Sequence, residues 1–205
     1  MDTLRYVEDT HQYFLGEKEL PSVSKILKFG DPAAHQFAQD EAAAERGKAV
    51  HRTIYLYING RLDDSSIHPT IAPYFDAFLR FEIEIARMQG VRFSYYKNLC
   101  ETPAYHPQAL YAGTPDILVR LGNQNVLIDI KTGTLPSWAA QQTAAYRYFP
   151  SIYALKPARW AVRLKGDGKY QIGFFHNHAG DLVGFLKHLQ KYKGGNIHGN
   201  STGIH

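Results

Sequence analysis

Residues 101–146 read ETPAYHPQALYAGTPDILVRLGNQNVLIDIKTGTLPSWAAQQTAAY, and the rest of the chain is organised around this stretch. We predict one strand over residues 112–121, a turn over 122–125 and a second strand over 126–131, which together form a hairpin. The second strand is almost entirely apolar. Such a run is typical of a strand that is buried on both faces in the middle of a sheet.

The second strand also carries an acid and a base, Asp129 and Lys131, and a further acid, Asp116, lies on the first strand. Strand side chains alternate, so Asp129 and Lys131 should point to the same face. Hard oxygen ligands that are held close together bind Mg²⁺ or Mn²⁺, and such an ion polarises phosphate and activates water for in-line attack. Lys131 would then hold the water or stabilise charge on the phosphate. The alternative is a buried Asp–Lys ion pair that only fixes the strand.

The composition favours one intracellular domain. The chain has 205 residues, and with 44% hydrophobic residues it can bury a full core. Its net charge of +4 is compatible with a nucleic-acid partner without being diagnostic. One cysteine, Cys100, excludes a disulfide framework and a four-cysteine metal cluster. No stretch reaches the roughly 18 apolar residues of a membrane span and the N-terminus has no signal-peptide character, so we expect a cytoplasmic protein without a membrane partner.

Outside the central stretch the sequence predicts further helices and hairpins. The expected elements are a hairpin over 4–20, a short helix over 21–29 capped by Ser22 or Ser24, helices over 32–57 and 71–89, a strand over 91–101, a helix over 135–148, a hairpin over 158–176 and a helix over 181–192. This order predicts an α/β (α+β) fold with a mixed central sheet flanked by helices and an N-terminal helical part. We expect residues 1–192 to form a single domain and 193–205 a flexible tail.

The helix over 32–57 carries a second group of candidate residues. Gly47 costs a helix about 1 kcal/mol relative to Ala, which indicates that another segment approaches closely there. His51 follows one turn later on the same face, although a lone histidine is usually a polar group at the edge of a core. Arg46, Lys48 and Arg52 lie beside it, and they form either a phosphate track or a solvated helix face.

Taken together, these residues resemble the signature of the PD-(D/E)XK nuclease superfamily, in its RecB-type or phage-type exonuclease branch. The matching motifs are Gly47-x-x-x-His51, Glu101, Pro115-Asp116 with its lead-in from Ala112, Asp129-Ile130-Lys131 and Gln142-x-x-x-Tyr146. Residues 20–27 also look like those of stand-alone, often phage-borne, members. The resemblance covers about residues 20–176 and implies a restriction-endonuclease-like core.

The resemblance also implies a set of roles. Metal binding would fall to His51, Asp116, Asp129 and the carbonyl of Ile130, catalysis to Glu101, Asp116, Asp129, Lys131, Gln142 and Tyr146, and nucleic-acid contacts to Arg46, Lys48, Arg52, Gln142 and Tyr146. Lys131 would orient the attacking water, and His51 would reach a second metal position, so that one or two Mg²⁺ or Mn²⁺ ions would bind. For Gln142 and Tyr146 the alternative is helix packing. A single cysteine leaves no room for the iron–sulfur cluster of some relatives.

We therefore expect a metal-dependent deoxyribonuclease, and within that class an exonuclease that acts on DNA ends or single strands in recombination, repair or phage DNA metabolism. A recombination or replication protein would be a further partner. Nothing in the chain resembles a sequence-reading recognition domain. Two alternatives stay open, a structure-specific endonuclease and a non-catalytic nucleic-acid-binding protein that keeps the nuclease fold.

Overall fold

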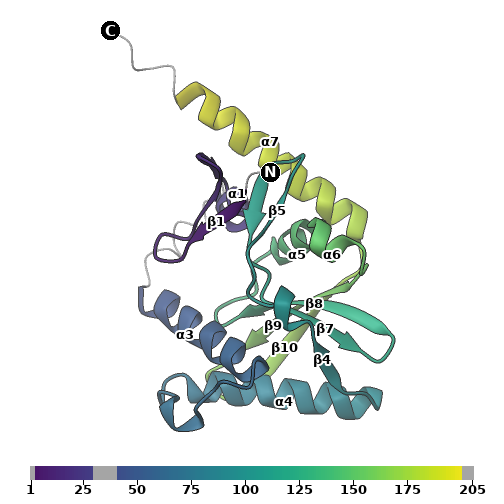
Figure 1. The fold of residues 1–205 in the computed structure, drawn as a ribbon. Helices are drawn as coiled ribbons and strands as arrows, with labels where there is room; N and C mark the ends of the chain where they lie inside the picture. The colour runs from purple at the N-terminus through teal and green to yellow at the C-terminus, as the bar shows by residue number, and fades with distance from the viewer. Residues whose placement is uncertain (1–2, 30–40, 200–205) are drawn as a thin grey trace.

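A central mixed sheet forms the frame of the molecule. The computed structural model describes residues 3–29 and 41–199, with the backbone alone for 196–199. Within them, the sheet has the strand order β10-β9-β8-β7-β4 (Figure 1). The strands are β4 (Phe93–Tyr95), β7 (Ile117–Leu121), β8 (Gln124–Lys131), β9 (Ala158–Leu164) and β10 (Tyr170–Phe175). Strands β8 and β9 are parallel and the other neighbouring pairs are antiparallel, so the predicted mixed sheet is confirmed.

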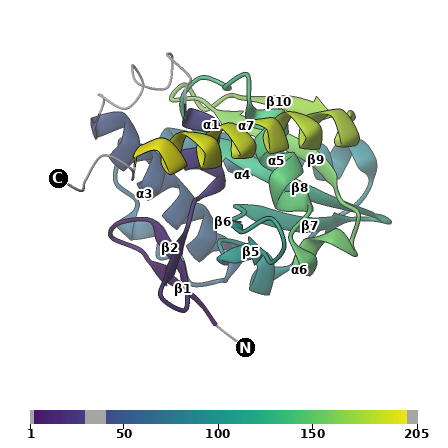
Figure 2. The ribbon, with the colours of Figure 1, turned by 90° about the horizontal axis from the view of Figure 1, so that it is seen from above.

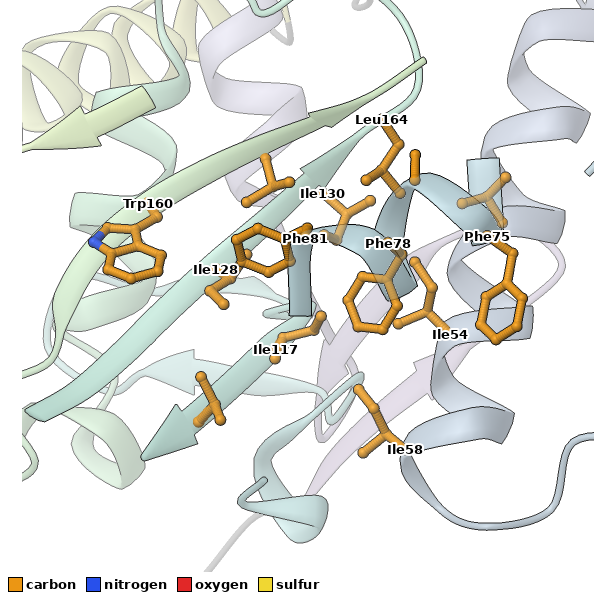
Figure 3. Packing of buried hydrophobic residues seen from close by; sticks show 14 of the residues in the cluster. Ile54, Ile58, Phe75, Phe78, Phe81, Ile117, Ile128, Ile130, Trp160 and Leu164 are labelled. Atoms are coloured by element: carbon orange, nitrogen blue, oxygen red, sulfur yellow. The ribbon is translucent and has the colours of Figure 1, made fainter. Parts of the chain in front are cut away.

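Helices cover both faces of this sheet and enclose two separate cores. On one face lie α3 (Glu41–Ile58) and α4 (Ala72–Gln89), and on the other lie α1 (Val23–Lys28), α5 (Ala139–Arg147), α6 (Pro150–Tyr153) and α7 (His178–Gly199). In β8, Ile128 and Ile130 pack toward α3 and α4, whereas Leu127 packs toward α5 and α7. Figure 3 shows Ile54 and Phe78 of the helices against these isoleucines. The predicted burial of this strand on both faces is confirmed.

Two smaller sheets stand beside the central one. The first contains β1 (Leu4–Val7), β2 (Gln12–Leu15) and β3 (Lys18–Leu20), and the second contains β5 (Ala104–His106) and β6 (Tyr111–Gly113). Figure 2 shows β1 and β2 on the same side of the molecule as β5 and β6. Tyr13, Leu20 and Ala112 form the small core between them. The helix α1 begins after Ser22, whose side chain caps it as predicted.

The predicted strand over 112–121 is wrong as one element. The structure breaks it at residues 114–116, so that β6 pairs with β5 and only β7 joins the central sheet. Pro115 explains the break, because it has no amide hydrogen for a ladder. The turn is also tighter than predicted, since β8 begins at Gln124.

Three other predicted boundaries are wrong. The strand over 91–101 is only β4, which is followed by a 3-10 helix at Lys97–Leu99. The helix expected from 135 begins at Ala139. The last helix, α7, continues to Gly199 rather than ending near residue 192, and residues 200–205 of the predicted tail lie outside the described part of the chain.

The predicted helix over 32–57 corresponds to α3 in its second half. Residues 32–40 of that prediction lie outside the described residues, and α3 runs from Glu41 to Ile58. The helix over 71–89 is confirmed as α4, and Gly90 ends it in the left-handed conformation that suits glycine. None of the helices in the described residues is both long enough and apolar enough to cross a membrane.

Candidate metal centre

Two acids meet where the central hairpin opens. Asp129 is on β8, and Asp116 directly precedes β7. The Asp116 Oδ2 accepts a hydrogen bond of 2.6 Å from the amide of Ile130. The carboxylate therefore takes the place of a backbone acceptor just where the break at Pro115 ends the ladder. Both acids are buried, with relative exposures of 8% for Asp116 and 1% for Asp129.

Glu101 reaches the same point through a strained backbone. Its φ of 48° lies in the left-handed region, which is uncommon for a residue other than glycine. Its amide donates to the carbonyls of Pro115 at 2.9 Å and Asp116 at 3.1 Å. The preceding residue, Cys100, is buried against Leu118, whose amide lies 3.4 Å from its sulfur. These contacts hold a conformation that costs on the order of 1–3 kcal/mol, and such strain clusters at functional sites.

His51 completes the group from α3. Its Nδ1 lies 3.0 Å from Glu101 Oε1 and 3.5 Å from Asp116 Oδ1. One ligand atom from each of these three side chains lies within 4.8 Å of the other two. They border a small hollow whose apolar wall includes Ile54 and Ile130. The structure therefore brings together two carboxylates and one imidazole, which is a donor set that a divalent ion accepts.

Asp129 lies beside this group and begins a chain of polar contacts. Its Oδ2 is 2.6 Å from Lys131 Nζ, which confirms that both side chains point to one face. Lys131 donates to Gln142 Oε1 at 3.0 Å, and Gln142 donates to the hydroxyl of Tyr146 at 3.2 Å. Asp129 Oδ1 is buried and has no hydrogen-bond partner among the described residues. The contact with Lys131 is an ion pair.

Burial and crowding shift the pKa values of these groups. Burial raises the pKa of Asp129 to about 6, against the opposing charge of Lys131. Burial likewise raises the pKa of Asp116, which the charge of His51 opposes. For His51, burial alone would lower the pKa, but the carboxylates of Asp116 and Glu101 raise it to about 9. Three acids thus compete for few partners. A divalent cation held by His51, Glu101 and Asp116 would relieve this repulsion.

Two glycines fit this site to different degrees. A Cβ on Gly113 would lie 2.6 Å from Cε1 of Tyr146, so only glycine lets that ring pack as it does. A Cβ on Gly47 would meet Thr132 Oγ1 at 3.4 Å, which is ordinary van der Waals contact. The predicted approach at Gly47 is therefore present but not tight. The requirement for glycine lies instead in the segment before Asp116.

The residues predicted to contact nucleic acid fall into two groups, one on α3 and the other on α5. Lys48 is exposed and pairs with Glu45 at 2.8 Å, and Arg52 is exposed beside Tyr55. Arg46 stacks over Tyr74, and its Nε is buried without a partner among the described residues. Gln142 and Tyr146 are buried on α5, with Tyr146 only 4% exposed. This burial favours helix packing and support of the site over contact with DNA.

Two residues near the site, Trp138 and Arg163, were not predicted from the sequence. Lys131 Nζ lies 5.9 Å from the centre of the Trp138 ring. Arg159 and Arg163 are on β9, and Arg163 is the direct register partner of Lys131. Their alternation along a strand was visible in the sequence, but the parallel register of β9 against β8 was not. Ile130 contributes its amide to Asp116, and its carbonyl as a metal ligand stays a prediction.

Comparison with known proteins gives distant likenesses of fold. No protein-family model and no curated protein matches the sequence. The crystal structure of an alkaline exonuclease (LHK-Exo) from Laribacter hongkongensis is similar at a TM-score of 0.31 and 13% identity, covering 86% of this chain and 93% of that chain. The structure of LHK-Exo in complex with dAMP is similar at a TM-score of 0.32 and 15% identity, covering 87% and 94%.

Proposed function

We propose that this protein is a metal-dependent deoxyribonuclease of the PD-(D/E)XK superfamily, and that it acts as an exonuclease on DNA ends or single strands. One observation carries the proposal. His51, Glu101 and Asp116 converge within 4.8 Å of one another, beside a buried pair of Asp129 and Lys131. The sequence motifs that resemble this superfamily come from five separate segments, and their side chains lie in one connected group.

The donor set fits a hard divalent cation. Asp116, Glu101 and Asp129 would hold it through carboxylate oxygens, and His51 would add a nitrogen. When bound, such an ion polarises the phosphate and makes water a stronger nucleophile at neutral pH. Because an imidazole nitrogen suits Mn²⁺ better than Mg²⁺, we expect Mn²⁺ to support the higher rate.

Lys131 is the residue that would handle the attacking water. Its ammonium is held between Asp129 at 2.6 Å and Gln142 at 3.0 Å. Once the Asp129 carboxylate binds a cation, the ammonium can donate to water or to a phosphate oxygen as charge develops there. Gln142 keeps the ammonium in place, and Tyr146 supports Gln142 from within the core. These two residues are positioning residues in this scheme.

We propose the exonuclease mode of action from the simple architecture of the described residues. The described residues build one layered α/β unit together with two small sheets, and no further module for reading base sequence stands among them. We propose that residues 1–192 act as a single nuclease domain. Binding through phosphates without base contacts suits an enzyme that works from an end.

The test uses one DNA sequence as a linear strand with labelled ends and as a covalently closed single-stranded circle. Each is incubated with Mg²⁺, Mn²⁺ or EDTA and with the wild type, Asp129→Ala or Asp76→Ala. Asp76 is an exposed acid on α4, so its substitution removes the same charge away from the site. We expect metal-dependent loss of the linear form alone, abolished by Asp129→Ala and unchanged by Asp76→Ala.

Other outcomes would change the conclusion. Cleavage of the circle would make the protein an endonuclease. Binding of DNA without cleavage of either form, under all metals, would make it a non-catalytic nucleic-acid-binding protein and would reduce the Asp129–Lys131 pair to a structural role. The label that leaves first from the linear strand gives the polarity of digestion.

A further inference from the structure

Arg163 lies beside the proposed catalytic lysine. Strands β8 and β9 run side by side in the central sheet (Figure 1). In their parallel ladder Lys131 is paired with Arg163, and the preceding pairs on that face are Asp129 with Ala161 and Leu127 with Arg159. Neighbouring strands are about 4.8 Å apart, and paired residues point to the same face. On its other side Arg163 is paired with Gln171 of β10, which is exposed. Arg163, which is partly buried, is therefore flanked by Lys131 on one side and by the exposed Gln171 on the other.

The guanidinium of Arg163 has no protein partner among the described residues. Its Nε is buried and donates to no acceptor, and Arg163 takes part in none of the ion pairs or ring contacts of the described side chains. Arg159 lies four residues earlier on the same strand and on the same face. Its guanidinium is bonded to Asp181, His178 and Ala140. The lack of partners is thus particular to Arg163 and not to arginines on β9.

An unpaired, partly buried cation is costly, because burial removes water that nothing replaces. Here the cost is increased by the ammonium of Lys131 on the next strand. Asp129 is the one acid that pairs with either of them among the described residues. Arg46 of α3 also has a buried Nε without a partner among the described residues, although its guanidinium lies over the ring of Tyr74. Arg163 therefore adds a cation without a partner beside the end of β8.

We propose that Arg163 binds a backbone phosphate of the nucleic-acid substrate next to the phosphate that is cleaved. This inference rests on the proposed function and adds to it a substrate-binding residue outside the matched motifs. The planar guanidinium offers paired donors that fit a phosphate, which makes it better suited to this contact than a lysine. An anion at this place would supply the missing partner and would offset the repulsion between Arg163 and Lys131.

Binding measurements separate this role from catalysis. We would measure anisotropy of an end-labelled single strand with Ca²⁺ in place of Mg²⁺, over a range of KCl concentrations, for the wild type, Arg163→Gln, Arg163→Lys and Arg120→Gln. Arg120 is an exposed arginine on β7 of the same sheet, paired with Asn125 at the far end of β8 from Lys131, and it makes the matched control.

Loss of one phosphate contact lowers the slope of log K against log salt by about 0.7 for a single strand. We expect Arg163→Gln to show this loss and to bind about tenfold more weakly at about 0.1 M salt. Arg163→Lys should keep the slope, since it keeps the charge, and bind with intermediate affinity. Arg120→Gln should behave as the wild type. Arg163→Gln should unfold at the same temperature as the wild type or higher, because it removes an unpaired buried charge.

Two results would overturn the inference while the proposed function stands. The first is a wild type that cleaves DNA together with an Arg163→Gln variant of unchanged affinity and slope. The second is an Arg163→Gln variant that unfolds at a much lower temperature, with Arg163→Lys also failing to restore the slope, which would make Arg163 a structural residue. A wild type that neither binds nor cleaves DNA would overturn both proposals.

Discussion

Two buried ionic clusters lie on the neighbouring strands β8 and β9, and they are built in opposite ways. On β9, Arg159 is fully paired: its guanidinium donates to Asp181 at 2.7 Å, to His178 at 2.9 Å and to the carbonyl of Ala140 at 2.6 Å. On β8, Asp129 keeps one oxygen without a partner among the described residues, although it is only 1% exposed. The first cluster is complete without a ligand and the second is not.

The difference is the one expected between a structural ion pair and a site that binds a ligand. The Arg159 cluster ties β9 to α5 and α7, and all of its contacts are internal. In the other cluster Glu101 adopts a strained backbone and burial raises the pKa of Asp116 and Asp129. Strain, like-charge crowding and an unpaired oxygen together have no structural benefit. They are expected where a cation and a phosphate complete the arrangement.

The largest expected effect is on activity at the incomplete cluster. Asp116→Asn keeps an oxygen that can accept from the Ile130 amide but removes a metal-binding charge. Nuclease activity should fall by at least about 10³-fold, while the free energy of unfolding stays the same or rises, since crowding among the acids decreases. Initial rates on labelled linear DNA and urea unfolding curves would measure the two. A stability loss as large as the activity loss would show that both clusters are structural.

The complete cluster should respond in the opposite sense. Asp181→Asn leaves the fully buried Arg159 without its counter-ion, and breaking a buried pair costs about 3–5 kcal/mol. Because the Asp181 side chain is 20% exposed, we expect a smaller loss of about 2–3 kcal/mol in the free energy of unfolding. Activity below the unfolding transition should be retained. Urea unfolding and rates at low temperature would test this, and loss of activity in a stable variant would contradict it.

A pH titration sharpens the same comparison. The pKa of His51 is raised from an ordinary 6.5 to about 9, so its proton adds stability to the metal-free protein below pH 6.5 that is lost as the pH rises through 9. A metal needs the neutral imidazole. Mn²⁺ affinity should therefore increase by about tenfold per pH unit between about pH 7 and 9. This range lies above the pKa of Asp129, which is about 6, so that carboxyl is already ionised throughout it. Calorimetry would measure it, and a flat profile in the wild type would argue against His51 as a ligand.

His51→Gln provides the control for this titration. Glutamine has no proton to lose in this range, so the dependence of Mn²⁺ affinity on pH should largely disappear between about pH 7 and 9. An unchanged slope in this variant would assign the titration to another group.

The smallest effect concerns the support of Lys131. In Gly113→Ala the new Cβ would lie 2.6 Å from the ring of Tyr146, so the ring and its contact with Gln142 must move. We expect a loss of about 1–3 kcal/mol in the free energy of unfolding, with a further loss of kcat as Lys131 is released. Gly47→Ala, with a contact of 3.4 Å, should not lower stability, because alanine is favoured in helix α3 by about 1 kcal/mol. Equal stability of the two variants would contradict this reading of the site.

Much of the frame could be predicted from local patterns. The apolar run of β8, the alternation that sets Asp129 and Lys131 on one face, and the helix ends at Ser22 and Gly90 depend on neighbouring residues alone. The break at Pro115 was also readable, because proline has no donor for a ladder. It was missed because the apolar residues on either side of Thr114-Pro115-Asp116 together predict one strand.

The sequence by itself determined which residues have the chemistry of a metal site, because acids, a histidine and a lysine keep their nature in any fold. Only the tertiary structure decided that Glu101 reaches the site through a left-handed backbone and that Arg163 stands beside Lys131. Both depend on strand register and chain crossings between distant segments. Local periodicity carries no information about which residue of β9 lies beside which residue of β8, since every alternative register preserves the same alternation.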